Sequence, residues 1–587
     1  MEQRDALLVR LSKFRLFSGH LMDQMGLLYV ATYATTQGFS TGVIDHTPIT
    51  LATIADTIRE SGARVVGFYV DHENVFPTMS AIGELKAMGL AQLAVVGGPQ
   101  ASVSPWDERI LRESRCDIAV RGEGEEAFTE ILRWFLKGQG SAGEILGVTY
   151  RDNGEIRRTP PRPLRQDLDC LPPPDRNLKQ IGPTHTGVDY LVTSRGCPYG
   201  CAFCYEGRPE ATYRVRSIAN VLAEVDQLLQ HRKPSYINIL DDTFMVKPSR
   251  VMEFCYGLTK LQAKHYKVHW FCEGRANVIA KHPEMIQAAV EAGLSRVQLG
   301  VETGTQAVLD AYRKDLTLDQ IRSAVKVCGE AGVLSIFGNF IVGGAFETWN
   351  TIQATIAFMQ ELHDLAPGRF ETSSTIYTPY PGTAMYDHPE LFGLATLDQD
   401  CVTGPGDNYP FTRTAALSKW EILHARQLFL EAVSKKMMDL LPKLPYEVLQ
   451  EHVSANYRIR LRTAWFSMIE QIFHYQKYFN MPYQEEYLHF RELPADRFES
   501  FKPVRTVMIG ASQDGELIVN LGYKKLQLNE VGTFILEHSY GKLTNAAIID
   551  RVWRRYFSQA DREVVREIVR EFFSMLDSER VVVFTLV

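Results

Sequence analysis

Three closely spaced cysteines form the pattern with the clearest chemical meaning in this sequence. Cys197, Cys201 and Cys204 stand in a C-x₃-C-x₂-C arrangement within the segment RGCPYGCAFCY. Iron–sulfur clusters are held by cysteine thiolates, and three thiolates on one compact loop can bind three irons of a [4Fe-4S] cluster. The fourth iron is then open to chelation by a small molecule. The alternatives are a chance grouping or a zinc site, although zinc usually takes four protein ligands and no second cysteine pair follows.

Polar residues follow several strand-like runs on the C-terminal side of these cysteines. Between residues 186 and 400, runs such as YINILDD and RVQLGVET alternate with helical segments, which predicts a partial (β/α)6 barrel. Active sites of barrels lie where strands end and loops begin. The residues at these positions are Asp241, Asp242, Glu273, Arg275, Glu302 and Gly338. Structural roles are the alternatives: a helix N-cap for Asp242, an ion pair for Glu273 with Arg275, and a turn at Glu302.

The cysteine loop after a first strand, together with the later strands, resembles the radical S-adenosylmethionine superfamily over residues 187–400. The resemblance implies that the open iron binds the amino and carboxylate groups of S-adenosylmethionine. It also implies an external electron donor, which drives cleavage of that molecule to a 5′-deoxyadenosyl radical. The implied contacts are the methionyl ammonium for Asp241 and Asp242, the methionyl carboxylate or ribose for Glu273 and Arg275, the ribose for Glu302, and the adenine for the backbone at Gly338.

Residues 1–135 alternate Val- and Ile-rich runs with helical segments, which predicts a doubly wound (Rossmann-like) parallel sheet. Ligands on such sheets bind beyond the carboxyl ends of the strands. The segments MGLLY, VGGPQA and RGEGEE, placed before a barrel, resemble the cobalamin-binding class of the superfamily. The Asp-x-His-x-x-Gly signature is absent from the sequence, so we expect no histidine of that motif on cobalt. The candidate cobalamin contacts are Tyr69, Gly97, Gly98, Gln100, Gly122 and Glu123.

The remaining segments predict a connector, a helical region and a small terminal module. Residues 136–185 contain a hairpin with its turn at Asn153-Gly154, and residues 401–500 are mostly helical. Residues 501–587 predict a winged-helix-like module that resembles the peptide-binding unit related to the pyrroloquinoline-quinone peptide chaperone, an RiPP recognition element-like unit. The resemblance implies that a leader peptide adds a strand near residues 515–526. A structural cap without a ligand is the alternative.

Composition limits the location and the partners of the chain. Its 587 residues carry a formal net charge of −7, which gives no overall attraction to nucleic acid or to an anionic membrane. The N-terminus lacks a long apolar run, so we expect a cytoplasmic protein without a signal peptide or a membrane span. The six cysteines outside the triad each stand alone, and we expect them to be buried small hydrophobic residues.

These features favour a cobalamin-dependent radical methyltransferase that transfers a methyl group from methylcobalamin to a carbon of a peptide or amino-acid-derived substrate in natural-product biosynthesis. Tyr205, Tyr377 and Tyr380 are candidates for the substrate pocket. A second enzymatic hypothesis is cyclisation, rearrangement or epimerisation of a peptide, with Cys272 and Cys328 as candidate hydrogen donors. A non-enzymatic hypothesis is a cobalamin-binding sensory protein with a degenerate barrel.

Metal analysis tests the two-cofactor hypothesis. Protein purified without oxygen, with cobalamin supplied, is expected to contain about four irons and about one cobalt per chain. Iron and sulfide counts, cobalt analysis and visible spectra measure both cofactors. Iron without cobalt would contradict the methyltransferase hypothesis and favour a peptide-modifying radical enzyme.

Overall fold

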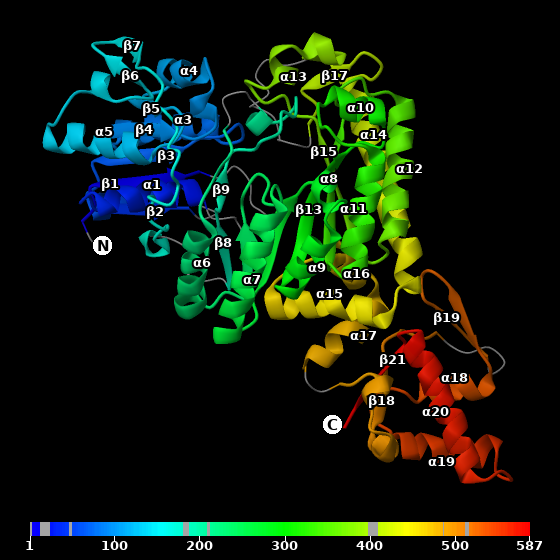
Figure 1. Cartoon of the computed structure of the whole chain (residues 1–587). Helices are drawn as coiled ribbons and strands as arrows, with labels where there is room; N and C mark the ends of the chain where they lie inside the picture. The colour runs from blue at the N-terminus through cyan, green and yellow to red at the C-terminus, as the bar shows by residue number, and fades with distance from the viewer. Residues whose placement is uncertain are drawn as a thin grey trace. The chain divides into compact units, whose positions relative to one another are not determined.

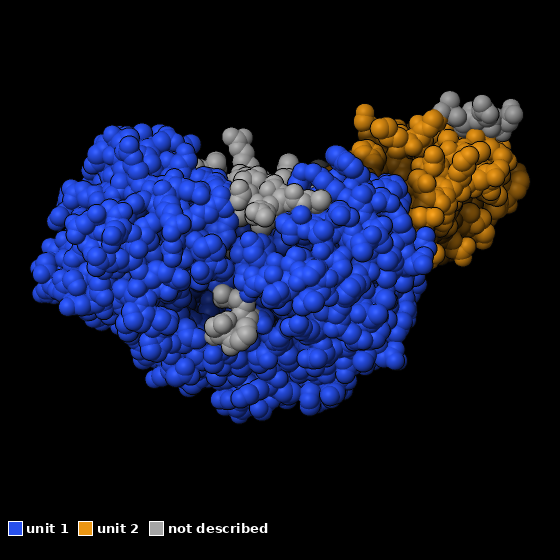
Figure 2. Space-filling model, turned by 90° about the horizontal axis from the view of Figure 1, so that it is seen from above, with its two compact units in different colours: residues 1–366, 372–432 blue, residues 367–371, 433–587 orange. Residues whose placement is uncertain are grey.

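The structure is a computed structural model that describes residues 3–11, 24–45, 50–179, 187–207, 212–396, 409–484, 487–510 and 516–586. It divides into two compact units (Figure 2). The first comprises Met1–Ala366 and Thr372–Ala432, and the second comprises Pro367–Glu371 and Val433–Val587. Among the described residues, no helix is both long enough and apolar enough to cross a membrane.

A seven-stranded sheet in the order β2-β1-β3-β4-β5-β6-β7 forms the N-terminal part of the first unit (Figure 1). The first five strands in this order are parallel, as predicted. Buried hydrophobic clusters cover both faces, which explains why the strands are rich in Val, Ile and Ala. The elements are β1 (Ala6–Arg10), α1 (Met25–Thr36), β2 (Thr41–Ile44), α2 (Leu51–Ser61), β3 (Val65–Tyr69), α3 (Val75–Ala87), β4 (Leu93–Gly97), α4 (Trp106–Glu113), β5 (Ile118–Val120), α5 (Glu125–Lys137), β6 (Val148–Asp152) and β7 (Glu155–Arg158).

Two features of this sheet go beyond the sequence patterns. β1, which those patterns do not predict, lies inside the sheet, between β2 and β3. The predicted hairpin forms, and both turn residues have positive φ, 49° at Asn153 and 92° at Gly154. Its first strand pairs with β5, so the sheet continues past residue 135 into the predicted connector.

A six-stranded sheet in the order β15-β14-β13-β12-β11-β8 carries the second half of the first unit (Figure 1). Adjacent strands from β8 to β14 are parallel, and helices follow the strands, as predicted for a partial barrel. The elements are β8 (Val188–Leu191), α6 (Ile218–Gln227), β11 (Tyr236–Ile239), α7 (Pro248–Lys264), β12 (His269–Gly274), α8 (Ala276–Ile279), α9 (Pro283–Glu291), β13 (Leu294–Glu302), α10 (Gln306–Ala311), α11 (Leu318–Glu330), β14 (Ser335–Val342), α12 (Trp349–Leu365), β15 (Phe370–Ile376), α13 (Ala384–Asp387), β16 (Leu394–Thr396) and β17 (Thr412–Thr414).

The second unit is helical in its first part and mixed in its last. The long helix α14 (Lys419–Leu440) belongs to both residue ranges. β18 pairs with β21, and β19 pairs with β20, both antiparallel. The other elements are α15 (Tyr446–Ile459), α16 (Ala464–Gln471), α17 (Phe473–Asn480), β18 (Lys502–Arg505), β19 (Leu517–Asn520), β20 (Lys525–Leu528), α18 (Glu530–Glu537), α19 (Asn545–Tyr556), α20 (Arg562–Ser578) and β21 (Val582–Thr585).

The approach of α12 to the end of β13 depends on Gly304. A Cβ at this position would lie 2.6 Å from the Cβ of Phe358 and 2.7 Å from the carbonyl oxygen of Ala354. Gly304→Ala should therefore destabilise the folded protein by about 1–3 kcal/mol, measured as a lower thermal unfolding temperature. Gly83→Ala, in α3, is the matched control because nothing lies within 4 Å of its Cβ. An unchanged unfolding temperature for Gly304→Ala would contradict this account of the packing.

Candidate active site

The cysteine loop leaves and re-enters the fold through a short antiparallel pair. β9 (Ser194–Arg195) pairs with β10 (Arg214–Val215) at the base of the loop. Gly196 follows with φ of 75°, and a Cβ there would lie 2.6 Å from the carbonyl oxygen of Thr212. Glycine is therefore required at this position, directly before the first cysteine of the motif.

Asp241 holds the strand that leads into the loop. Its carboxylate accepts hydrogen bonds from the backbone N–H of Thr193 at 2.6 Å and from the hydroxyl of Ser194 at 2.7 Å. Burial raises the pKa of Asp241, and these hydrogen bonds oppose the shift. The prediction that Asp241 contacts a cofactor is therefore corrected: both of its oxygens point to the end of β8, and Asp242 is the member of the pair that faces the cavity.

The carboxyl ends of the barrel strands enclose a cavity of about 360 Å³. Gly338 pairs with Leu299 in the sheet and does not line the cavity. Asn339 and Ile341 do line the cavity, because alternate residues of a strand face opposite sides of the sheet. Predicted residues in the wall are Cys197, Cys201, Cys204, Asp242, Glu273, Arg275, Glu302, Tyr377 and Tyr380, and unpredicted ones include Tyr199, Gln298, Lys314, Asn339, Thr375 and Thr378.

Arg275 presents hydrogen-bond donors to this cavity. Its side chain is buried, and the guanidinium carbon lies 3.6 Å from the centre of the Tyr199 ring. Nη1 is 4.0 Å from the sulfur of Cys201, while Nε and Nη2 are buried without a hydrogen-bond partner in the described part of the chain. A buried donor without a partner is costly, so the site fits a ligand with a carboxylate, such as S-adenosylmethionine.

Acidic side chains also line this cavity. Burial, reinforced by the charge of Asp242, raises the pKa of Glu273 to about 8, and Gln298 Nε2 donates to Glu273 at 2.9 Å. Asp242 is exposed to solvent. Even so, desolvation by the surrounding protein, and after it the negative charge of Glu206, raise the pKa of Asp242 to about 7. Glu302, at φ of 65°, pairs with Lys314. A cationic ligand would favour the ionised form of these carboxyls, which suits a sulfonium or an ammonium group.

The cysteine sulfurs do not form a site for a single ion. In the described segments, no three His, Cys, Asp or Glu side chains converge closely enough to hold one metal ion. Ligands of a [4Fe-4S] cluster bind different irons and need not meet at one point, whereas zinc ligands must. The three cysteines share one cavity wall, and this arrangement fits a cluster better than zinc.

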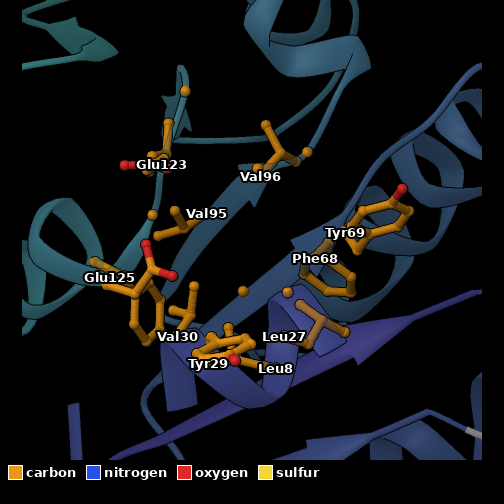
Figure 3. Close-up of a pocket in the computed structure, with 18 of the residues that line it drawn as sticks. Leu8, Leu27, Tyr29, Val30, Phe68, Tyr69, Val95, Val96, Glu123 and Glu125 are labelled. Carbon is orange, nitrogen blue, oxygen red and sulfur yellow. The ribbon is translucent and has the colours of Figure 1, made fainter. Parts of the chain in front are cut away.

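A second cavity, of about 250 Å³, lies at the carboxyl ends of β3, β4 and β5 (Figure 3). Its wall is mostly apolar. A Cβ at Gly98, where φ is 119°, would lie 2.6 Å from the carbonyl oxygen of Val70, and a Cβ at Gly67 would lie 2.5 Å from Cδ2 of Leu8. These glycines keep the floor open for a flat apolar group, which fits part of a cobalamin.

The predicted cobalamin contacts divide into two groups. The residues that line the second cavity are Tyr69, Gly97, Gly98, Gly122 and Glu123. Gln100 lies outside this wall: it is buried, and its backbone N–H donates to Val70 at 3.2 Å. The wall also contains Tyr29 and Glu125, from the MGLLY and RGEGEE segments, and Arg195, from the cysteine motif; none of the three is among the candidate contacts.

The remaining candidate residues of the sequence analysis make contacts with the N-terminal sheet or lie in the core. Tyr205 donates from its hydroxyl to the carbonyl of Pro99 at 3.3 Å, and thereby joins the barrel to the N-terminal sheet. The ring of Tyr380 lies 4.7 Å from that of His72, edge to face. Cys272 and Cys328 are fully buried outside the wall of the first cavity, which argues against their role as hydrogen donors.

Comparison with known proteins agrees with both halves of this arrangement. Residues 191–359 match the model of the radical SAM superfamily, and residues 17–132 match that of the B12 binding domain. The uncharacterised methyltransferase PH0819 of Pyrococcus horikoshii is 30% identical over 371 residues, which cover 62% of this chain and 78% of the relative.

Two solved structures share the fold. The radical S-adenosylmethionine methyltransferase TsrM from Kitasatospora setae, with tryptophan substrate and an S-adenosylmethionine analogue bound, has a TM-score of 0.55 at 18% identity, covering 69% of this chain and 80% of TsrM. The cobalamin-dependent S-adenosylmethionine radical enzyme OxsB, with aqua-cobalamin and S-adenosylmethionine bound, has a TM-score of 0.58 at 17% identity, covering 81% of this chain and 76% of OxsB.

The raised pKa of Glu273 predicts a pH-dependent stability difference. An unfolded glutamate releases its proton near pH 4.5, and the folded protein keeps this one to about pH 8. The folded state therefore binds more protons in this window, and the contribution of Glu273 to stability falls as the pH rises. Because Glu273→Gln cannot ionise, its unfolding temperature relative to the parent should rise between about pH 5 and about pH 8.

That difference is measured by thermal unfolding without added S-adenosylmethionine. Glu291→Gln, at an exposed position in α9, is the matched control and should not show it. A constant difference between Glu273→Gln and the parent across the window would contradict the assigned environment of Glu273.

Proposed function

Because this chain belongs to the cobalamin-dependent radical S-adenosylmethionine methyltransferases, we propose that it methylates a carbon atom of a peptide or amino-acid-derived substrate in natural-product biosynthesis. The observation that carries the proposal is the pair of cavities within one unit. One holds the cysteine triad and the other lies on the glycine-rich ends of the N-terminal sheet. A single-cofactor enzyme has no need of both.

The residues of the barrel cavity suit the binding of S-adenosylmethionine beside a cluster. When bound, the cluster supplies the electron that cleaves S-adenosylmethionine, and cobalamin supplies the methyl group. The three cysteines would hold the cluster, and the buried donors of Arg275 would orient the methionyl carboxylate. Asp242 and Glu273 would accept hydrogen bonds from the ammonium and hydroxyl groups. The ion pair of Glu302 with Lys314 closes this wall.

The rest of the cavity wall supports a polar substrate. Asn339, Thr375, Thr378 and Tyr380 present an amide and hydroxyl groups from β14, β15 and the loop that follows. Such groups pair with the amides of a peptide or with the polar groups of an amino acid. TsrM, which shares the fold, holds tryptophan in its structure, and we extend an amino-acid-derived substrate to this chain as part of the proposal.

The terminal module supports a peptide substrate with a leader segment. We treat residues 501–587 as a winged-helix-like, RiPP recognition element-like unit. In the described residues, β19 and β20 form a sheet of their own, so their outer edges can accept a further strand. Ile518, on β19, is 59% exposed and would pack against the added strand. The leader would bind at this edge, near residues 515–526, and deliver the core peptide to the barrel.

Methyl transfer tests this function directly. The holoenzyme, with reductant and S-adenosylmethionine labelled in its methyl group, is incubated with leader-bearing peptides and with free amino acids. Mass spectrometry should detect the labelled methyl group on carbon in one of these products. Cys201→Ala should abolish this product because a cluster ligand is lost, whereas the matched control Cys255→Ala, which replaces a buried cysteine in α7, should retain it.

Three outcomes decide between the alternatives. Label on a peptide but not on free amino acids supports the leader-binding role of the terminal module. Label on a free amino acid alone contradicts that role and leaves methyl transfer in place. A product without label, altered by cyclisation or epimerisation, contradicts methyl transfer.

A further inference from the structure

A cluster of charged side chains joins the wall of the N-terminal cavity to the base of the cysteine loop. Arg195 Nη1 donates to Glu123 Oε1 at 2.9 Å, and Arg195 Nη2 donates to Glu125 Oε1 at 2.5 Å. Arg214 Nη1 lies 2.9 Å from the same oxygen of Glu123. These four residues, Glu123, Glu125, Arg195 and Arg214, are called the bridging cluster below.

The arginines of the bridging cluster lie at the base of the cysteine loop. Arg195 and Arg214 are directly opposite each other in the β9–β10 pair. Only Gly196 separates Arg195 from Cys197, and its φ of 75° and the lack of room for a Cβ beside the carbonyl oxygen of Thr212 restrict the backbone path between them. The ion pairs of Arg195 therefore fix the backbone two residues before Cys197, the first ligand of the predicted cluster.

The glutamates lie on the other side, in the loop after β5 and at the start of α5. Glu123, Glu125 and Arg195 all line the N-terminal cavity, and Figure 3 shows Glu125 between Glu123 and Tyr29 along one side of it. The Arg195 guanidinium carbon lies 5.3 Å from the centre of the Tyr29 ring, which belongs to the same wall. One group of side chains is thus shared between a ligand cavity and a metal-binding loop.

The ion pairs of the bridging cluster respond to the filling of this cavity. The side chains of Arg195 and Glu123 are 19% and 20% exposed, and both line the cavity. Burial opposes ionisation of Glu123, but Arg195 and Arg214 outweigh it and lower the pKa of Glu123. A ligand in the cavity removes water from these charges, and their attraction strengthens as the local dielectric falls. Loss of one partner instead leaves a charge buried without compensation.

We infer that the bridging cluster couples the two cofactor sites, so that cobalamin binding orders the cysteine loop and an assembled iron–sulfur cluster raises the affinity for cobalamin. Arg195 and Glu123 are positioning residues for both sites. The inference rests on the proposed placement of cobalamin at the N-terminal cavity. Coupling between binding sites is reciprocal, so each cofactor must affect the other by the same factor.

Binding of hydroxocobalamin to the full-length protein tests the coupling. Its dissociation constant is measured by absorbance titration, first with the cluster assembled and then after the iron has been removed by a chelator. In the parent protein the cluster-free form should bind about tenfold more weakly. Hydroxocobalamin should also slow the loss of iron to the chelator. Both effects are read without substrate and without turnover.

Substitutions at the bridging cluster locate the effect. Glu123→Gln, which keeps the size of the side chain but removes the charge shared by two arginines, should bring the ratio of dissociation constants close to one. Arg195→Lys should reduce the ratio but not abolish it. Lysine keeps the positive charge, but its ammonium group cannot donate to both glutamates in the planar geometry of arginine. Arg322→Gln is the matched control: it breaks the pair of Arg322 with Glu361, whose bonds are 2.7 and 3.0 Å, and should leave the ratio unchanged.

The outcomes separate this inference from the proposed function. A tenfold ratio that survives in Glu123→Gln, or a ratio of one in the parent, would overturn the coupling while cobalamin still binds. Failure of both forms of the parent to bind hydroxocobalamin would overturn the proposed function and the coupling with it. If circular dichroism shows that Glu123→Gln is unfolded, the ratio in folded Arg195→Lys decides, and an unreduced ratio there overturns the coupling.

Discussion

The two ends of the cysteine loop are held by carboxylates that each accept several hydrogen bonds. Asp241 accepts from the backbone N–H and the hydroxyl of Thr193 at the end of the first barrel strand, and Glu123 accepts from Arg195 and Arg214 at the base of the loop. A carboxylate removed from water is costly unless its oxygens are paired, so each is stable only while its partners stay in place. These contacts fix the base of the loop, whose described residues contain one short 3-10 helix at Tyr205–Gly207.

Parallel strand geometry places both ligand cavities. Parallel strands end at one edge of a sheet, and in both sheets of the first unit this edge carries the glycines and charged groups. In the N-terminal sheet the strands are buried on both faces and pack mainly through aliphatic side chains. Loops at the carboxyl ends are therefore free to carry ligand-binding residues, and the cavities differ accordingly: one is polar with a cysteine triad, and the other is apolar with a glycine floor.

Sequence patterns predict the elements and motifs well but cannot settle which single residue of a strand end faces a cavity. The cysteine spacing and the polar residue after each strand are local features, and the triad and Asp242 lie in one wall; their roles as ligands stay predictions. Asp241 and Gly338 fail because a shift of one residue turns a strand position to the other face, as Asn339 shows for Gly338. The role of Arg195 depends on contacts with glutamates about seventy residues earlier in the chain, which no local pattern reveals. The strand β1 is missed for a similar reason, since its partners lie far along the chain.

We propose that one unit of this chain binds an iron–sulfur cluster and a cobalamin in neighbouring cavities. Anomalous X-ray scattering at the iron and cobalt edges, from crystals grown without oxygen, tests it most directly. We expect an iron peak bounded by the sulfurs of Cys197, Cys201 and Cys204, and a cobalt peak beyond the carboxyl ends of β3 and β4. An iron peak without cobalt, or cobalt bound elsewhere on the chain, would contradict it.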